Sequence, residues 1–141
     1  MKKITILTIL VYTTLMAGVT QKATWYDETW RKAPMASGYM YDKNRMEAAH
    51  RSLPFGTIVD VKNLGNGKVV RVIITDRGPY PNGLKAEHHN GKVIDLTPVA
   101  FEKIAKLKTG VIKIEMRVVK RGPCKTYNCY KKYPYRRGVR K

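Results

Sequence analysis

The segment 34–57 combines groups that can move a proton with groups that can bind a polar ligand. Asp42 supplies a carboxylate and His50 an imidazole, in a stretch without clear helical or strand periodicity. Irregular backbone supported by flanking strands is a common place for binding and catalytic residues. A second motif, at 75–79, places Asp76 at the end of an apolar strand. We expect these two segments to face each other across one groove, where acid/base chemistry is possible.

Each of these residues also has a plainer interpretation, and the residue types alone leave both open. Asp42 is a residue type that often bonds its own backbone in a turn. His50 fits a structural histidine at a strand end, or a hydrogen-bonding group in the groove. Asp76 with Arg77 fits a knot that holds the following loop, and such a knot is compatible with a functional site.

The rest of the chain predicts short strands that position this groove. An Asn-Gly pair between two β-rich runs predicts a hairpin, and Thr97-Pro98 predicts the start of a helix over 99–107. Turn signals recur often, so closure into a small barrel is the natural way to bury the strand edges. About six short strands are expected, five of which are visible as runs at 23–26, 57–64, 68–75, 93–96 and 111–119.

Both ends of the chain differ from this middle part. Residues 1–22 begin with a short basic stretch, Lys2 and Lys3, followed by an apolar run too short to span a membrane, which predicts a signal peptide and export to the periplasm, cell envelope or exterior. The tail, 120–141, is basic and tyrosine-rich, and we expect it to be flexible. In an exported chain, Cys124 and Cys129 indicate a small disulfide loop.

Several ordered blocks together resemble the rare lipoprotein A family of bacterial septal-ring lytic transglycosylases. The resemblance implies a six-stranded double-psi β-barrel over 23–119, which binds peptidoglycan glycan strands, preferably those stripped of stem peptides. It also implies cleavage without water between N-acetylmuramic acid and N-acetylglucosamine, leaving a 1,6-anhydro end. The blocks are Ala-Thr-Trp-Tyr (23–26), Ala-Ser-Gly (36–38), Tyr-Asp (41–42), Ala-Ala-His-Arg-Ser-Leu-Pro-Phe-Gly-Thr (48–57), Val-Lys-Asn-Leu-Gly-Asn-Gly (61–67), Asp-Arg-Gly-Pro-Tyr (76–80) and Val-Ile-Asp-Leu (93–96).

The sequence departs from the family pattern at three places. The family's Ala-Ser-Gly-Glu motif has its glutamate, a catalytic candidate, where this chain has Tyr39. The loop 81–92 is longer than usual and contains two histidines, which we interpret as a solvated loop rather than a metal site. The family's peptidoglycan-binding repeat domain does not follow the barrel, and only the basic tail does.

On this resemblance, Asp42 is the expected acid/base, because one carboxyl can both give a proton to the glycosidic oxygen and later take one from a sugar hydroxyl. A free aspartate titrates near pH 4, so burial or a neighbouring carboxylate must raise its pKa. Glu47 is a conceivable substitute for the missing glutamate, although its spacing does not place it in the groove. The candidate set is Asp42, His50 and Asp76 for catalysis, with Ser37, Tyr39, Tyr41 and Arg77 for substrate binding.

The formal net charge of +18 predicts attraction to polyanions. Export makes glycan strands, anionic wall polymers or anionic lipid the expected partners, and nucleic acid is not expected. We expect a monomer without cofactor or metal. The alternative to an enzyme is a barrel that kept the groove, lost the family glutamate and only binds glycan. A third hypothesis is a polyanion-binding protein that acts through its basic tail.

Overall fold

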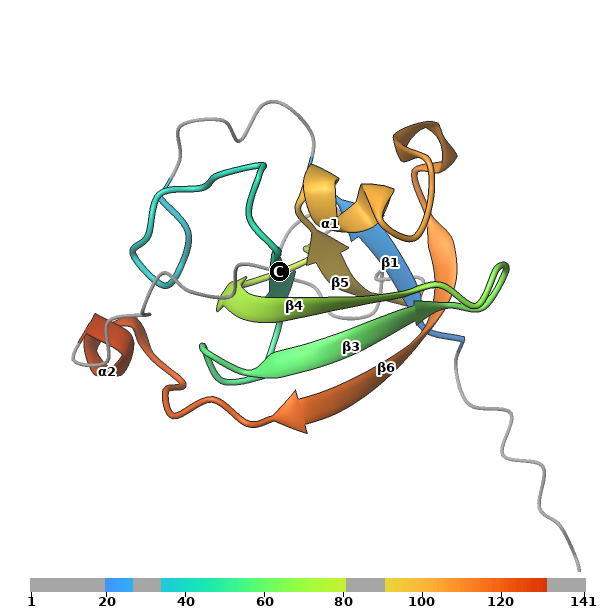
Figure 1. The fold of residues 1–141 in the computed structure, drawn as a ribbon. Helices are drawn as coiled ribbons and strands as arrows, with labels where there is room; N and C mark the ends of the chain where they lie inside the picture. The colour runs from blue at the N-terminus through green and yellow to red at the C-terminus, as the bar shows by residue number, and fades with distance from the viewer. Residues whose placement is uncertain (1–19, 27–33, 81–90, 132–141) are drawn as a thin grey trace, which may run out of the picture.

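The computed structural model describes residues 20–26, 34–80 and 91–131, and within them the strands close into a barrel (Figure 1). The strands pair in the order β1-β5-β2-β4-β3-β6. Two neighbouring pairs, β1 with β5 and β2 with β4, are parallel, whereas the other pairs are antiparallel. The prediction of a mainly β, six-stranded double-psi barrel is confirmed. The strands are β1 (Lys22–Trp25), β2 (Glu47–His50), β3 (Ile58–Asn63), β4 (Val69–Asp76), β5 (Lys92–Leu96) and β6 (Ile112–Lys120).

The hairpin of β3 and β4 forms where the sequence predicts it. Its register pairs Ile58 with Ile73 and Lys62 with Val69, so the connection falls on the Gly-Asn-Gly turn. Gly67 in this turn has a φ of 72°, a left-handed conformation that glycine adopts without a steric penalty. The turn chemistry therefore sets the register of β3 and β4.

Strand β2 is the strand that the sequence pattern did not reveal. Its sequence, Glu-Ala-Ala-His, contains no β-branched or aromatic residue, so β propensity is low. Pairing on both edges, with β4 and with β5, fixes its extended conformation, and its two alanines are buried. The β2–β4 register places Ala49 opposite Asp76, which brings the two sequence motifs next to each other.

All six strands contribute aliphatic side chains to the barrel interior, and Phe101 and Ile104 complete this core from the segment after β5. Helix α1 (Pro98–Glu102) and the 3₁₀ turn η3 (Leu107–Thr109) occupy that segment. The predicted helix over 99–107 is therefore too long. The core needs a compact cover here, and one short helix followed by a tight turn buries the same apolar side chains.

Thr97 precedes α1 as predicted, and Pro98 lies in the first turn. The Thr97 side chain makes no capping hydrogen bond, because its hydroxyl instead donates to the carbonyl oxygen of Arg45 in the loop before β2. This residue thus connects the helix start to the loop that carries Asp42.

Residues 120–131 differ from the expected flexible tail. Figure 1 shows helix α2 (Tyr127–Lys131) near the loop that precedes β2. The Phe55 N–H donates to the Cys124 carbonyl oxygen at 2.6 Å, and Cys124 is fully buried and bonded to Cys129. The composition lacks aliphatic residues, but a disulfide and a buried aromatic partner anchor this part of the chain.

Three further predictions concern residues outside those that the structure describes. They are the predicted signal peptide, apart from its last residues, the histidine-containing part of the long loop, and residues 132–141. In the part of the chain that the structure describes, no helix has the length and apolar character needed to cross a bilayer.

Candidate active site

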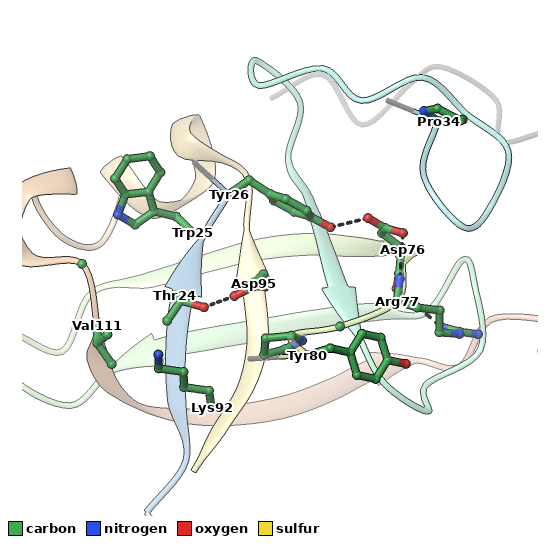
Figure 2. Close-up of a pocket in the computed structure, with 13 residues that line it drawn as sticks. Thr24, Trp25, Tyr26, Pro34, Asp76, Arg77, Tyr80, Lys92, Asp95 and Val111 are labelled. Carbon is green, nitrogen blue, oxygen red and sulfur yellow. Dashed lines mark hydrogen bonds between the residues drawn. The ribbon is translucent and has the colours of Figure 1, made fainter. Parts of the chain in front are cut away.

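A cavity of about 620 Å³ opens where the ends of β1, β4 and β5 meet (Figure 2). It contains two carboxyl groups, those of Asp76 and Asp95, and the cationic groups of Arg77 and Lys92. Aromatic and proline side chains contribute to its walls. Its lining residues are Thr24, Trp25, Tyr26, Pro34, Asp76, Arg77, Gly78, Pro79, Tyr80, Lys92, Asp95, Gly110 and Val111. Ligand sites commonly combine polar groups with apolar and aromatic surface in this way.

Asp76, the last residue of β4, accepts hydrogen bonds from three different parts of the chain. Oδ2 accepts from the Tyr26 hydroxyl at 2.7 Å, and Oδ1 accepts from the Ala36 N–H at 2.7 Å and the Arg77 N–H at 2.8 Å. Burial and the negative charge of Asp76 raise the pKa of Tyr26 far above its ordinary value, so its phenol stays a donor. Asp76 therefore joins β1 and the first motif segment to β4.

Asp95 lies in the same cavity, and the sequence analysis did not select it. It accepts a hydrogen bond from the Thr24 hydroxyl across the parallel β1–β5 pair. Burial raises its pKa to about 6, with a further increase from the charge of Asp76, against the opposing effect of Lys92. A charged residue between buried Ile94 and Leu96 was the sequence signal that this position faces a polar cavity.

Arg77 lines the cavity and also holds the surrounding loops together. Its Nη1 donates to the carbonyl oxygens of His50 at 3.2 Å and Leu53 at 2.9 Å, and its Nη2 donates to that of Lys125 at 3.0 Å. The guanidinium carbon lies 3.7 Å from the ring centroid of Phe55. The predicted knot used Arg77 as the internal partner of the Asp-Arg-Gly turn, whereas these partners of the guanidinium are backbone carbonyl groups of other segments.

His50 ends β2 with its ring turned back onto the next residues. Its Nδ1 accepts hydrogen bonds from the N–H groups of Ser52 at 3.2 Å and Leu53 at 3.0 Å. Burial, followed by the positive charges of Arg51 and Arg77, lowers its pKa to about 4. The ring is therefore neutral at neutral pH, and Nδ1 serves to hold the turn after β2.

Asp42 lies outside the cavity, in the loop that precedes β2, and its partners are close in sequence. Oδ1 accepts from the Asn44 N–H at 2.9 Å, and Oδ2 lies 3.4 Å from Nε of Arg45. Its side chain is 41% exposed. These are the contacts of an aspartate that stabilises its own turn.

Arg45 also approaches a second carboxyl group, because its Nη1 lies 3.8 Å from Oε1 of Glu47. Glu47 is almost completely buried, and its Oε2 has no hydrogen-bond partner within the described residues. Burial raises the pKa of Glu47 to about 7, although Arg45 acts in the opposite direction. A buried carboxyl this close to Asp42 and Asp76 adds a titrating group that its place in the sequence did not reveal.

The three hydroxyl-bearing candidates of the first motif do not line the cavity. Ser37 is buried and donates its N–H to the Thr75 carbonyl oxygen at 3.2 Å. Tyr41 is buried with its ring 5.1 Å from that of Tyr26. Tyr39 packs against two clusters, one of which contains Phe55 and the disulfide. Of the predicted substrate-binding residues, the structure thus places only Arg77 in the cavity.

Within residues 20–26, 34–80 and 91–131, no three His, Cys, Asp or Glu side chains gather in a way that could hold a metal ion. The adjacent histidines of the long loop lie outside these ranges.

The family model described as lytic transglycolase matches residues 19–116. A probable endolytic peptidoglycan transglycosylase RlpA of Aquifex aeolicus is 39% identical over 100 residues, covering 71% of this chain and 41% of that protein. The endolytic peptidoglycan transglycosylase RlpA of Vibrio cholerae is 35% identical over 98 residues, covering 70% of this chain and 34% of that protein. The chain spans less than half the length of these relatives.

Two solved structures share the barrel. The Streptomyces papain inhibitor superposes with a TM-score of 0.54 at 27% identity, over 72% of this chain and 93% of that one. An expansin of Clavibacter michiganensis gives a TM-score of 0.53 at 23% identity, over 74% of this chain and 52% of that one. Proteins with such different names use one barrel, so the function must be argued from the groove.

Proposed function

We propose that this chain, which belongs to the lytic transglycolase family, cleaves peptidoglycan glycan strands between N-acetylmuramic acid and N-acetylglucosamine and leaves a 1,6-anhydro end. One observation carries the proposal: two carboxyl groups in unlike surroundings share one groove. Such a pair divides into a proton-carrying acid and a charge-stabilising carboxylate, because different environments separate the two pKa values.

The reaction requires a group that first gives a proton and then takes one back. Asp95 suits this role, because burial raises its pKa to about 6 and keeps a useful fraction protonated near neutral pH. Its proton goes to the glycosidic oxygen as the C1–O bond breaks. The resulting Asp95 carboxylate then takes the proton of the C6 hydroxyl, whose oxygen bonds to C1 and closes the anhydro ring.

Asp76 is suited to stabilise the positive charge that develops at C1 before the ring closes. Its three hydrogen-bond donors come from the residue after β1, the first motif segment and the next residue's backbone, so the carboxylate is fixed before substrate binds. The Tyr26 phenol maintains that position, since its raised pKa keeps it a donor.

Asp42 and His50 stay in the proposal with other roles. The resemblance marks Asp42 as a second candidate for the acid, and its half-exposed carboxylate beside Arg45 is accessible from solvent. His50 acts as a positioning residue, because its Nδ1 holds the turn whose carbonyl oxygens bind Arg77.

Strands stripped of stem peptides remain the proposed substrate form, as the resemblance implies, and they still carry charge opposite to that of this chain. Loss of the peptide leaves a free carboxylate on each muramic acid, and this chain has a net charge of +18. Arg77 and Lys92 bring positive charge into the groove itself. The proposed site of action is the cell envelope, where the curated relatives' named substrate is found.

The test is digestion of peptide-stripped glycan strands, with products identified by mass spectrometry. Anhydro-ended fragments from the unmodified protein, absent with Asp95→Asn, are the expected result. Hydrolysed ends with a free reducing sugar would contradict the proposed reaction. Asn keeps the size and polarity of the side chain but cannot carry the proton.

The second candidate function is glycan binding without cleavage. Tyr39, at the position of the family's glutamate, favours it, because a phenol replaces the family's carboxyl group and its ring packs against Phe55 and the disulfide. In this case, stripped strands would sediment with the protein and no fragment would appear in the digestion.

A further inference from the structure

The last described segment of the chain, Gly122–Lys131, lies beyond the family match, which ends at residue 116. We refer to it as the C-terminal turn. It packs on the family's own motif segments, since Cys124 joins Phe55 in a buried cluster and Tyr39 packs against both. An element outside the shared domain is therefore placed directly on the part of the barrel that carries the motifs.

The C-terminal turn is held by several independent contacts. The disulfide closes it, and the Phe55 N–H donates to the Cys124 carbonyl oxygen at 2.6 Å. Nη2 of Arg77 donates to the Lys125 carbonyl oxygen at 3.0 Å. Gly122 lies so close to the backbone that an added Cβ would come within 2.2 Å of the Phe55 carbonyl oxygen. These contacts fix the turn relative to Arg77, a residue of the groove.

This anchoring places the Tyr127 ring on Gly38. A Cβ at Gly38 would lie 2.0 Å from Cε2 of Tyr127, so the ring occupies the space that any other residue's side chain would need. Tyr127 is nevertheless 46% exposed, which is high for an aromatic ring held by a packed turn. The ring therefore presents a fixed aromatic surface to solvent.

Exposed residues of the first motif lie between the groove and this ring. Pro34 lines the groove, and Ala36 donates its N–H to Asp76 at 2.7 Å inside it. Ala36 and Gly38 are both exposed, and Gly38 contacts Tyr127. A long ligand that occupies the groove beside Asp76 can thus extend over this segment onto Tyr127.

The chemistry of the C-terminal turn fits a peptide-stripped glycan strand. The C–H faces of pyranose rings pack well on aromatic rings, and a tyrosine presents such a face at little cost in side-chain entropy. The C-terminal turn contains two lysines, Lys125 and Lys131, and no acidic residue, which favours a polymer with a carboxylate on every second sugar. Small apolar ligands would use neither the length of this surface nor its charge.

We propose that the C-terminal turn is an additional glycan subsite, in which the Tyr127 ring stacks on a sugar of the strand beyond the groove. The subsite rests on the proposed function for its ligand class. It also accounts for Tyr39, whose ring supports the turn in the place where the family has a glutamate. Only strands long enough to leave the groove reach Tyr127, so the subsite confers a preference for long substrates.

The experiment compares Tyr127→Ala with Tyr127→Phe on peptide-stripped strands of two size classes, tetrasaccharides and strands above about twenty sugars. Binding to peptide-stripped sacculi is measured in parallel by sedimentation. Loss of one stacked ring should reduce cleavage efficiency on long strands and affinity for sacculi by roughly three- to ten-fold. Tetrasaccharide cleavage should be unchanged, and Tyr127→Phe should behave like the unmodified protein because it keeps the ring.

Equal losses on both size classes, or no loss on either, would overturn the subsite while leaving the proposed cleavage intact. The reverse outcome is binding to sacculi that depends on Tyr127, with no anhydro product in the digestion. That result would support the subsite and reject the proposed cleavage. The double variant Cys124→Ser/Cys129→Ser opens the turn and should reproduce the loss that is selective for long strands. A double variant that cleaves long strands normally would contradict the subsite.

Discussion

Asp76 and Asp42 are both motif aspartates, and they differ in where their hydrogen-bond partners come from. The donors to Asp76 include Tyr26 and Ala36, which lie 50 and 40 positions away in the sequence. The partners of Asp42 are Asn44 and Arg45, two and three positions away. Only the first arrangement requires the folded barrel.

This contrast indicates which of the two carboxylates the folded barrel orients. A local turn contact forms wherever the sequence permits it and fixes nothing beyond the turn. A carboxylate that collects donors from separate elements is oriented by the whole structure, as a preorganised charge must be. On this reasoning, the chemistry belongs to the groove with Asp76 and Asp95, and Asp42 belongs to its supporting loop.

The largest effect on stability that we predict concerns the buried carboxyl beneath that loop. Glu47 has its pKa raised to about 7 in the folded protein, so the folded state carries an increasing penalty as pH rises from its ordinary value near 4.5. Glu47→Gln removes this penalty and should stabilise the protein by up to about 3 kcal/mol at pH 8. Urea unfolding at pH 8 and pH 4 measures the difference.

At pH 4 both proteins carry an uncharged side chain here, so their unfolding midpoints should nearly coincide. An equal change at both pH values would show that the effect comes from packing or from Arg45, and would remove Glu47 from the titrating groups near the site.

The pH dependence of cleavage sharpens the assignment of the groove acid. Asp95 must be protonated to act, and its pKa is raised to about 6, so kcat/KM should fall as pH rises above 6. The loss should reach roughly 100-fold at pH 8.

Lys92→Gln removes a charge that lowers the pKa of Asp95 and should therefore move this fall in kcat/KM to higher pH. A fall in kcat/KM at the same pH in both proteins would exclude Asp95 as the acid.

Tyr26→Phe tests the long-range partners of Asp76. The change deletes the hydroxyl that donates to Oδ2 at 2.7 Å, and a hydrogen bond to a charged group of this kind contributes about 2 kcal/mol. Denaturant unfolding at pH 7 should show a loss of that size. In an Asp76→Asn background the loss should shrink, and equal losses in both backgrounds would mean that the hydroxyl acts through other contacts.

Asp42→Asn should have the smallest effect on stability. Asparagine keeps an oxygen for the Asn44 N–H and loses only the ion pair with Arg45, whose two side chains are partly exposed to solvent. We expect a change below about 1 kcal/mol in the free energy of unfolding. A loss of several kcal/mol would mean that Asp42 holds distant parts of the fold, as Asp76 does.

The sequence was sufficient for elements whose conformation is decided locally. The Gly-Asn-Gly turn predicted the β3–β4 hairpin, and alternation predicted β6 and its buried Ile112 and Ile114. It was insufficient for β2, where pairing on both sides overrides weak propensity. It also gave too long a helix after Thr97, because tertiary contacts replace the last helical turn with a 3₁₀ turn.

The candidate site was predicted only in part, because some of its residues are recognisable from local sequence and others depend on tertiary contacts. The sequence motif at the end of an apolar strand singled out Asp76 and Arg77, and the structure places both in the groove. Asp95 was read only as part of a strand, since nothing in a single strand reveals that Thr24 lies beside it on the parallel neighbour. Glu47 and the C-terminal turn depend on burial and on a disulfide, which composition does not place in space.

The most direct test of the account is a side-by-side digestion of peptide-stripped strands by Asp95→Asn and Asp42→Asn at pH 5, with anhydro ends counted by mass spectrometry. Loss of a general acid should slow Asp95→Asn by roughly 100- to 10,000-fold. Asp42→Asn should keep its rate to within about ten-fold, as a turn residue outside the groove would. An inactive Asp42→Asn beside an active Asp95→Asn would contradict the account and return the chemistry to the loop before β2.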